Sequence, residues 1–229
     1  MVVFQGMSQT QCHEEYELAL MDSFKARVEK LDPSAEVTVK CFSPPMMPGG
    51  SQTGWAEYTP LPGEKYKSTT NVENVAEQLG QSMGGGASGA WDWVANQFEL
   101  GAIGIAVGAS NGAIPAAACA LYFNYMVKPE HTRMPLLVLL SGMPAAVQQD
   151  ELTDYYGKVL MTVGRQEETF GGPSTFYTFA SRIMADVKAF EGGHSRESEA
   201  LLRKLGKMLA KDLLLHTLGK IPAKELVWF

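Results

Sequence analysis

The sequence lacks most of the features that mark secreted and membrane proteins. Its 229 residues include only three cysteines, no Asn-x-Ser/Thr acceptor and no apolar run long enough to cross a bilayer. Because the cysteines are few and odd in number, we expect Cys12, Cys41 and Cys119 to be free thiols in a reducing, cytoplasmic compartment. The first residues lack the charged leader and apolar core of a signal peptide. They open directly inside a strand-like run, so whether a targeting peptide precedes them stays open.

An excess of positive charge is also absent. The chain carries 19 lysines and arginines against 25 aspartates and glutamates, a net charge of −6 with histidine neutral. This balance argues against nucleic acid or an anionic membrane as the main partner. No Gly-x-Gly-x-x-Gly follows a strand-like run, and no histidines and cysteines cluster at metal-ligand spacing. We therefore expect no cofactor and no metal.

What the sequence does contain is an alternation of strand-like and helix-like segments. Short apolar, β-branched runs occur at Val2–Gln5, Glu36–Phe42, Ile103–Val107, Pro135–Ser141 and Lys158–Val163. Apolar residues at near-helical spacing predict helices over 16–31 and 201–213. No internal repeat or composition shift divides the chain. We therefore expect a single α/β domain over 1–229, with a mostly parallel sheet of about five to six strands and helices on both faces.

Two segments interrupt this regular pattern. Residues 43–67 are rich in proline and glycine, which predicts an extended loop excursion. The glycine-rich run 84–89 separates two helix-like stretches, 72–83 and 90–98. Such a run is typical of a flexible linker or insertion, or alternatively of a hinge for a mobile cap over a site.

The motif with the clearest chemical meaning is Gly108-Ala-Ser-Asn-Gly112. It follows an apolar run and precedes a small-residue, helix-forming segment, which is the strand–turn–helix setting of a nucleophile elbow. The glycines let strand and helix pass closely while Ser110 adopts a strained conformation. The hydroxyl of Ser110 is then held beside the helix N-terminus, where backbone N–H groups can stabilise negative charge. The alternative is an ordinary glycine-rich turn.

A serine nucleophile needs a histidine base, and the chain has four histidines. His13 precedes the motif, His131 lies in a polar turn, and His216 ends the last helix-like segment, where a solvated or capping role fits. His194 lies in a glycine-flanked loop ahead of the last long helix. From such a loop a side chain can reach over the strand ends, so we predict that His194 is the base.

The base in turn needs a carboxylate, which in this chain order follows a later strand. The strand-like run 158–163 leads into a polar loop that contains Glu167 and Glu168. Only one of two adjacent glutamates can point inward; we favour Glu167, with Glu168 as the close competitor. Asp150 and Asp154 precede this strand and are weaker candidates.

The remaining parts of such a site are backbone donors and an apolar pocket. One oxyanion N–H should come from Asn111, next to the nucleophile, and the other from Met7, in the loop after the first strand. Met46, Met47 and Met143 also fall in strand-end loops. Their adaptable thioethers could line an acyl pocket, although methionine is equally common in ordinary cores.

These segments together resemble the α/β-hydrolase superfamily and, more narrowly, the FSH-type serine hydrolases, which are related to carboxylesterases. The resemblance runs over nearly the whole chain. It rests on Gln5-Gly-Met7, Gly89-Ala-Trp-Asp-Trp-Val94, Gly108-Ala-Ser-Asn-Gly-Ala113, Ser141-Gly-Met143, Val163-Gly-Arg-Gln-Glu167 and Gly192-Gly-His194. It implies a triad of Ser110, Glu167 and His194 on an α/β-hydrolase fold. The chain departs from the family at Gln5, where a histidine is usual, and at Glu167, where an aspartate is usual.

The resemblance implies a metal-independent serine hydrolase that cleaves a carboxylic ester of a small molecule through an acyl-enzyme. Two alternatives remain. A thioesterase would release acyl chains from a carrier protein or coenzyme A, and a non-catalytic protein on the same fold would bind an apolar ligand. In the second case Gln5 and Glu167 would be signs of lost catalysis. Residues 43–67 and 84–89 follow no family pattern, so neither the substrate nor the oligomeric state is predicted.

Overall fold

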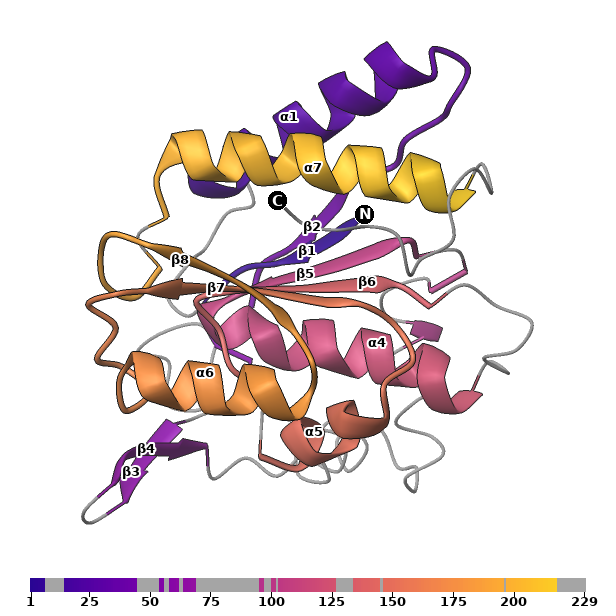
Figure 1. Cartoon of the computed structure of the whole chain (residues 1–229). Coiled ribbons are helices and arrows are strands. Elements are labelled where there is room, and N and C mark those ends of the chain that lie inside the picture. The colour runs from indigo at the N-terminus through magenta and orange to yellow at the C-terminus, as the bar shows by residue number, and fades with distance from the viewer. Residues whose placement is uncertain are drawn as a thin grey trace.

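The computed structural model describes residues 1–6, 15–44, 54–55, 58–61, 64–68, 95–96, 100–101, 103–126, 134–144, 146–195 and 197–217. Within these residues, one sheet of six parallel strands has the order β2-β1-β5-β6-β7-β8 (Figure 1). The strands are β1 (Val2–Phe4), β2 (Lys40–Phe42), β5 (Ile105–Ala109), β6 (Leu136–Leu140), β7 (Val159–Gly164) and β8 (Asp186–Phe190). The parallel α/β sheet expected from the alternating segments is confirmed.

The strand order reverses between β1 and β5. From β1 the chain passes to β2 at one edge of the sheet, later enters β5 on the other side of β1, and then continues stepwise to β8. In open parallel sheets, ligands bind outside the carboxyl ends of the strands where the order reverses. Gln5 and Ser110, which directly follow β1 and β5, therefore lie where a site is expected.

Helices cover both faces of the sheet (Figure 1). On one face lie α1 (Glu15–Leu31) and α7 (Glu199–Thr217); on the other lie α4 (Ala113–Met126), α5 (Ala146–Glu151) and α6 (Pro173–Arg182). Among the described residues, no helix has both the length and the apolar character to span a membrane.

Each face of the sheet has its own cluster of buried apolar side chains. The cluster under α1 and α7 includes Leu20, Phe24, Leu205 and Leu209. The cluster under α4 and α6 includes Phe4, Leu121, Leu139 and Phe176. Strands β5 and β6 contribute side chains to both clusters. Because both of their faces are covered, these central strands read in the sequence as continuous apolar runs rather than alternating ones.

All five strands predicted from the sequence are present, and β2 is shorter than its predicted run. The sequence does not predict β8, whose residues Asp-Val-Lys-Ala-Phe are mostly half-exposed at the edge of the sheet. Since such an edge strand needs no continuous apolar run, it has little sequence signal.

The segment 43–67 is not an extended loop throughout. In its second half, β3 (Tyr58–Leu61) and β4 (Glu64–Ser68) form an antiparallel hairpin. The turn dipeptide Pro62-Gly63 stands between the two strands in the sequence, and it is a signal for this hairpin. The glycine-rich run 84–89 lies outside the described residues, as do most of the helix-like stretches beside it.

The cysteines do not all meet the expectation of free thiols. Cys119 is a free, buried thiol. Cys41 is disulfide-bonded, so the prediction is wrong for this residue. An odd count excludes only that every cysteine is paired; one disulfide still leaves one of three cysteines free. Because disulfides persist mainly in oxidising compartments, the cysteine argument for a cytoplasmic location fails.

Candidate active site

Ser110 lies on a sharp bend between β5 and α4. Its φ of 48° is in the left-handed region, which costs a non-glycine residue free energy and persists only where the surroundings enforce it. The flanking glycines are needed because strand and turn pass very close to each other. A Cβ on Gly108 would lie 2.3 Å from the carbonyl oxygen of Gly112, and one on Gly112 would lie 2.2 Å from that of Phe4. The motif therefore adopts the strand–turn–helix geometry expected of it.

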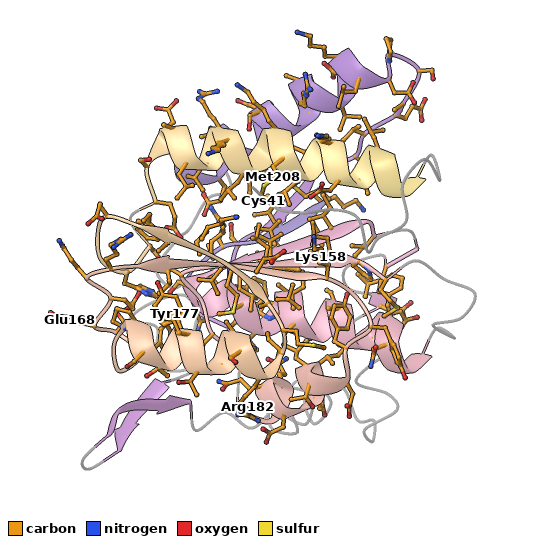
Figure 2. All side chains as sticks on the ribbon, in the orientation of Figure 1. Cys41, Lys158, Glu168, Tyr177, Arg182 and Met208 are labelled. Atoms are coloured by element: carbon orange, nitrogen blue, oxygen red, sulfur yellow. The ribbon has the colours of Figure 1, made fainter. Side chains whose placement is uncertain are left out.

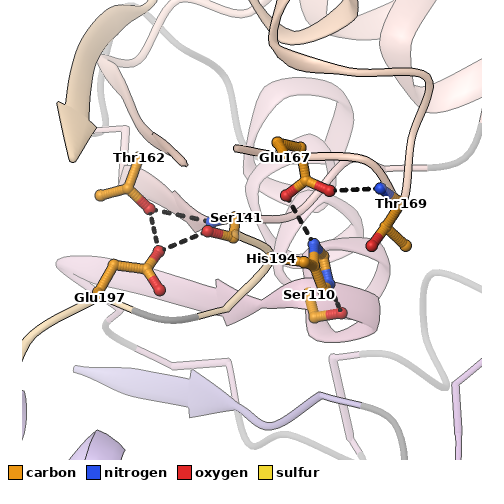
Figure 3. Close-up of polar contacts among 7 residues, drawn as sticks. All are labelled: Ser110, Ser141, Thr162, Glu167, Thr169, His194 and Glu197. Atoms are coloured by element: carbon orange, nitrogen blue, oxygen red, sulfur yellow. Dashed lines mark hydrogen bonds and ion pairs between the residues drawn. The ribbon is translucent and has the colours of Figure 1, made fainter. Parts of the chain in front are cut away.

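The hydroxyl of Ser110 faces the imidazole of His194 (Figure 3). The distance from Ser110 Oγ to His194 Nε2 is 2.6 Å, which is within hydrogen-bond range and within reach of direct proton transfer. His194 lies in the loop that follows β8, 84 positions further along the chain. The structure thus brings the two residues together at the carboxyl ends of the strands.

Glu167 completes this series of contacts. Its Oε2 is 2.9 Å from His194 Nδ1, and its Oε1 accepts a 2.7 Å hydrogen bond from the backbone N–H of Thr169 (Figure 3). Burial raises the pKa of Glu167, but the hydrogen bonds and charge from His194 and the bonds from Thr169 outweigh burial and leave the pKa below its ordinary value. An ionised Glu167 can hold the proton of His194 on Nδ1, so that Nε2 is free to accept one from the serine.

The neighbouring glutamate points elsewhere. Glu167 is 2% exposed, whereas Glu168 is exposed and lies at the outer edge of the molecule (Figure 2). Of the weaker acid candidates, Asp150 instead forms an ion pair with Arg182. Among the histidines, His13 and His131 lie outside the described residues, and His216 is in the last turn of α7.

The loops that carry Glu167 and His194 are joined by their backbones. Arg165 N–H donates to the carbonyl of Phe190, and Gln166 N–H donates to that of Gly192, each at 2.9 Å. A Cβ on Gly164 would lie 2.5 Å from the Gly192 carbonyl oxygen, so the two loops are in direct contact. Because β7 and β8 are neighbours in the sheet, their pairing continues into these loops and brings Glu167 and His194 close together.

An aromatic side chain packs against His194. The ring of Phe170 meets that of His194 edge-on, with a centroid distance of 5.3 Å and an interplanar angle of 64°. Phe170 is itself buried and contacts Phe176 of α6 in the same way. The imidazole is thus held on one side by an apolar ring and at Nδ1 by Glu167, which limits its rotation.

The region of the expected oxyanion donors is only partly described. Asn111 is fully buried next to Ser110, and its side-chain oxygen accepts a 2.5 Å hydrogen bond from the backbone N–H of Trp55. The indole N–H of Trp55 donates to the carbonyl of Gln5 at 2.7 Å. Trp55 therefore ties the loop after β2 to the ends of β1 and β5, a role for which the sequence has no signal. Met7 lies outside the described residues.

The side chain of Gln5 makes hydrogen bonds to two other elements. Its side chain is buried; its amide donates to a carboxylate oxygen of Glu17 at 3.3 Å, and its oxygen accepts from the hydroxyl of Ser43 at 2.8 Å. These bonds hold the end of β1 to α1 and to the end of β2. An uncharged amide can make both contacts because it is donor and acceptor at once.

The methionines expected to line a pocket are only partly described. Met143 is buried in the cluster on the α4 side of the sheet. Met46 and Met47 lie outside the described residues. In the part of the chain that the structure describes, no group of three or more histidines, cysteines and acidic residues could hold a metal ion.

Comparison with known proteins finds similarity in structure and not in sequence. No protein-family model matches the chain, and no curated protein matches it either. SOBER1 of Arabidopsis thaliana is 14% identical with a TM-score of 0.52, and the match covers 93% of this chain and 97% of that one. Esterase PE8 is 15% identical, with a TM-score of 0.54 and coverages of 92% and 90%. Est1E from Butyrivibrio proteoclasticus is 11% identical, with a TM-score of 0.51 and coverages of 95% and 87%. Together with the strand order and the bend at Ser110, these matches show that the chain has the α/β-hydrolase fold.

Proposed function

We propose that this protein is a serine hydrolase that cleaves a carboxylic ester through an acyl-enzyme. Ser110 is the nucleophile, His194 the base, and Glu167 the carboxylate that orients the base. The observation that carries this proposal is the unbroken series of contacts from the Ser110 hydroxyl through the imidazole to the Glu167 carboxylate. The strained backbone at Ser110 and the fold shared with an esterase support it further.

In the first half of the reaction, Ser110 Oγ attacks the carbonyl carbon of the ester while its proton passes to His194 Nε2. Glu167 accepts a hydrogen bond from Nδ1–H and stabilises the imidazolium that forms. The carbonyl oxygen becomes an oxyanion beside the N-terminus of α4, where the backbone N–H of Asn111 is the expected donor, with Met7 as the second. Collapse of this intermediate breaks the bond to the leaving oxygen, which takes the proton from Nε2 and departs as an alcohol.

In the second half, a water molecule replaces the alcohol. His194 Nε2 accepts a proton from the water as its oxygen attacks the acyl carbon. The second tetrahedral intermediate expels Ser110 Oγ, which recovers its proton from the imidazolium, and the carboxylic acid leaves. The same three side chains thus serve both halves, and the reaction needs no metal and no cofactor.

Substitution of the nucleophile tests the proposal directly. We expect Ser110→Ala to abolish turnover of short p-nitrophenyl esters and covalent labelling by a fluorophosphonate probe, since both require the serine oxygen. Ser181→Ala is the matched control, because Ser181 is exposed on α6; it should label and turn over as the wild type does. Equal labelling of Ser110→Ala and wild type would show that another residue is the nucleophile.

A second measurement separates ester from thioester hydrolysis. Matched oxygen and thiol esters of the same acyl chain should be hydrolysed with kcat/KM values that favour the oxygen ester. A clear preference for the thiol ester would assign the thioesterase alternative. Absence of labelling in the wild type, together with binding of an apolar ligand, would assign the non-catalytic alternative.

A further inference from the structure

A second buried carboxylate lies close to the proposed triad (Figure 3). Glu197 follows His194 by three residues and is only 5% exposed. Its Oε1 accepts hydrogen bonds from the hydroxyl of Ser141 at 2.7 Å and from the hydroxyl of Thr162 at 2.5 Å. A carboxylate is costly to bury, and two hydroxyl donors on one oxygen are contacts that offset this cost.

The two hydroxyl residues belong to neighbouring strands and the turn between them and the site. Ser141 directly follows β6, and Thr162 is a buried residue of β7. The backbone N–H of Ser141 donates to Thr162 Oγ1 at 2.9 Å, so Ser141, Thr162 and Glu197 form a closed ring of three hydrogen bonds. Ser141 has a φ of 45°, a strained value that persists only where the surroundings enforce it. The ring includes both the backbone N–H and the hydroxyl of Ser141, so it restrains the residue that has this φ.

The turn that this ring holds touches the backbone of the nucleophile. A Cβ on Gly142 would lie 2.5 Å from the carbonyl oxygen of Ser110 and 3.1 Å from its nitrogen. Ser110 has a strained φ of its own, so its backbone needs support from a fixed neighbour. The turn after β6, in which Gly142 lies close to the backbone of Ser110, gives this support.

From these contacts we propose that Glu197 is a positioning residue for the Ser110–His194 pair. The inference rests on the proposed function. The carboxylate belongs to the segment that carries the base, and through Ser141 and Thr162 it fixes the turn that supports the nucleophile. It therefore ties together the two segments whose separation sets the Oγ–Nε2 distance. The hydrogen bonds of Glu197 described above are to Ser141 and Thr162, so we expect its effect on catalysis to pass through these two residues.

Two matched pairs of variants test this role. Glu197→Ala removes the acceptor, whereas Glu197→Gln keeps an oxygen that can accept both hydroxyls. Thr162→Val removes the hydroxyl, whereas Thr162→Ser keeps it. We expect the Ala and Val variants to lose about 10- to 100-fold in kcat on short esters and in fluorophosphonate labelling rate, because small misplacements of reacting groups are costly. KM should stay within about threefold, and the Gln and Ser variants should recover most of the rate.

Melting curves recorded alongside show whether each variant is folded at the assay temperature. If Glu197→Ala does not fold, the comparison of Thr162→Val with Thr162→Ser by itself shows whether loss of the hydrogen bond to Glu197 lowers kcat. Folded Ala and Val variants that label at the wild-type rate, or that change KM and not kcat, overturn the proposal. An equal loss in the Gln and Ser variants also overturns it, because the hydrogen bonds would then not be the cause. Failure of the proposed function looks different, since the wild type itself would neither label nor hydrolyse esters.

Discussion

Two adjacent glutamates in the loop after β7 differ in burial and in their contacts. Glu167 is buried and contacts both His194 and the backbone of Thr169, whereas Glu168 is exposed (Figure 2). Side chains of neighbouring residues leave an extended segment in different directions, so only one can face the base. A glutamate is one methylene longer than the aspartate expected from the family resemblance. The 2.9 Å contact with Nδ1 shows that the loop accommodates this length.

Substitution of Glu167 and of Glu168 tests which of the two carboxylates orients His194. We expect Glu167→Ala to lower kcat on short esters by roughly 10²- to 10⁴-fold, because the imidazole loses the carboxylate that fixes its tautomer and stabilises its charge. Glu168→Ala should stay within about twofold of the wild type, as expected of an exposed side chain without such contacts. Steady-state kinetics on both variants measures this. If the two variants lost kcat to a comparable extent, or Glu168→Ala lost more, Glu167 would not be the carboxylate that orients His194.

At the scale of elements, the packing of α1 against α7 depends on one small residue. A Cβ on Gly206 would lie 2.1 Å from the hydroxyl oxygen of Ser23 and 2.4 Å from the carbonyl oxygen of Leu20. The Ser23 hydroxyl already donates to that carbonyl at 3.0 Å, so it cannot move away without losing a hydrogen bond. The two helices therefore approach as closely as a glycine allows, and both lie on the same face of the sheet (Figure 1).

A methyl group at this contact should separate the helices. We expect Gly206→Ala to lower the free energy of unfolding by about 1–3 kcal/mol, the usual cost of overpacking a buried contact, despite the better helix propensity of alanine. Gly101→Ala is the control, since a Cβ there meets nothing within 4 Å; its effect should be below about 0.5 kcal/mol. Urea denaturation of the two variants measures the difference. A Gly206→Ala variant as stable as the wild type would contradict the close packing.

For the molecule as a whole, stability should depend on a carboxyl group remote from the triad. Asp212 of α7 is 7% exposed, and its Oδ2 finds no hydrogen-bond donor among the described residues. Burial raises the pKa of Asp212 to about 6, although Lys158 and Lys211 oppose the shift. Lys158 stands just before β7, where it also forms a 3.5 Å ion pair with Asp186 (Figure 2). The folded protein thus binds a proton at Asp212 more tightly than the unfolded chain does.

The sign of the pH dependence follows from this difference. The contribution of protonated Asp212 to stability is fully present below its ordinary pKa of 3.8 and is lost as the pH rises through about 6. Asn cannot ionise, so Asp212→Asn should avoid this loss and be more stable than the wild type at pH 7, by about 1–2 kcal/mol once solvent screening is allowed for. The advantage should shrink as the pH falls toward 4. Chemical denaturation of both proteins from pH 4 to pH 7 measures it, and a difference that stays constant over this range contradicts the assignment.

Local sequence was enough to predict the central strands and the bend at Ser110. These features depend on neighbours in sequence: apolar runs that fill both faces of a strand, and glycines where strand and turn cross. The polar edge strand β8 and the hairpin of β3 and β4 were not predicted. Their strands depend on hydrogen bonds to a partner strand and less on burial of their own side chains.

By itself, the sequence determined the fold class and a short set of candidate residues for the site. Only the tertiary structure decided which of the two glutamates faces His194, that Cys41 is in a disulfide, and that Glu197 is hydrogen-bonded to Ser141. The physical reason is that burial, hydrogen-bond partners and the pairing of side chains are set by distances between segments far apart in the chain. No local pattern of residues encodes those distances.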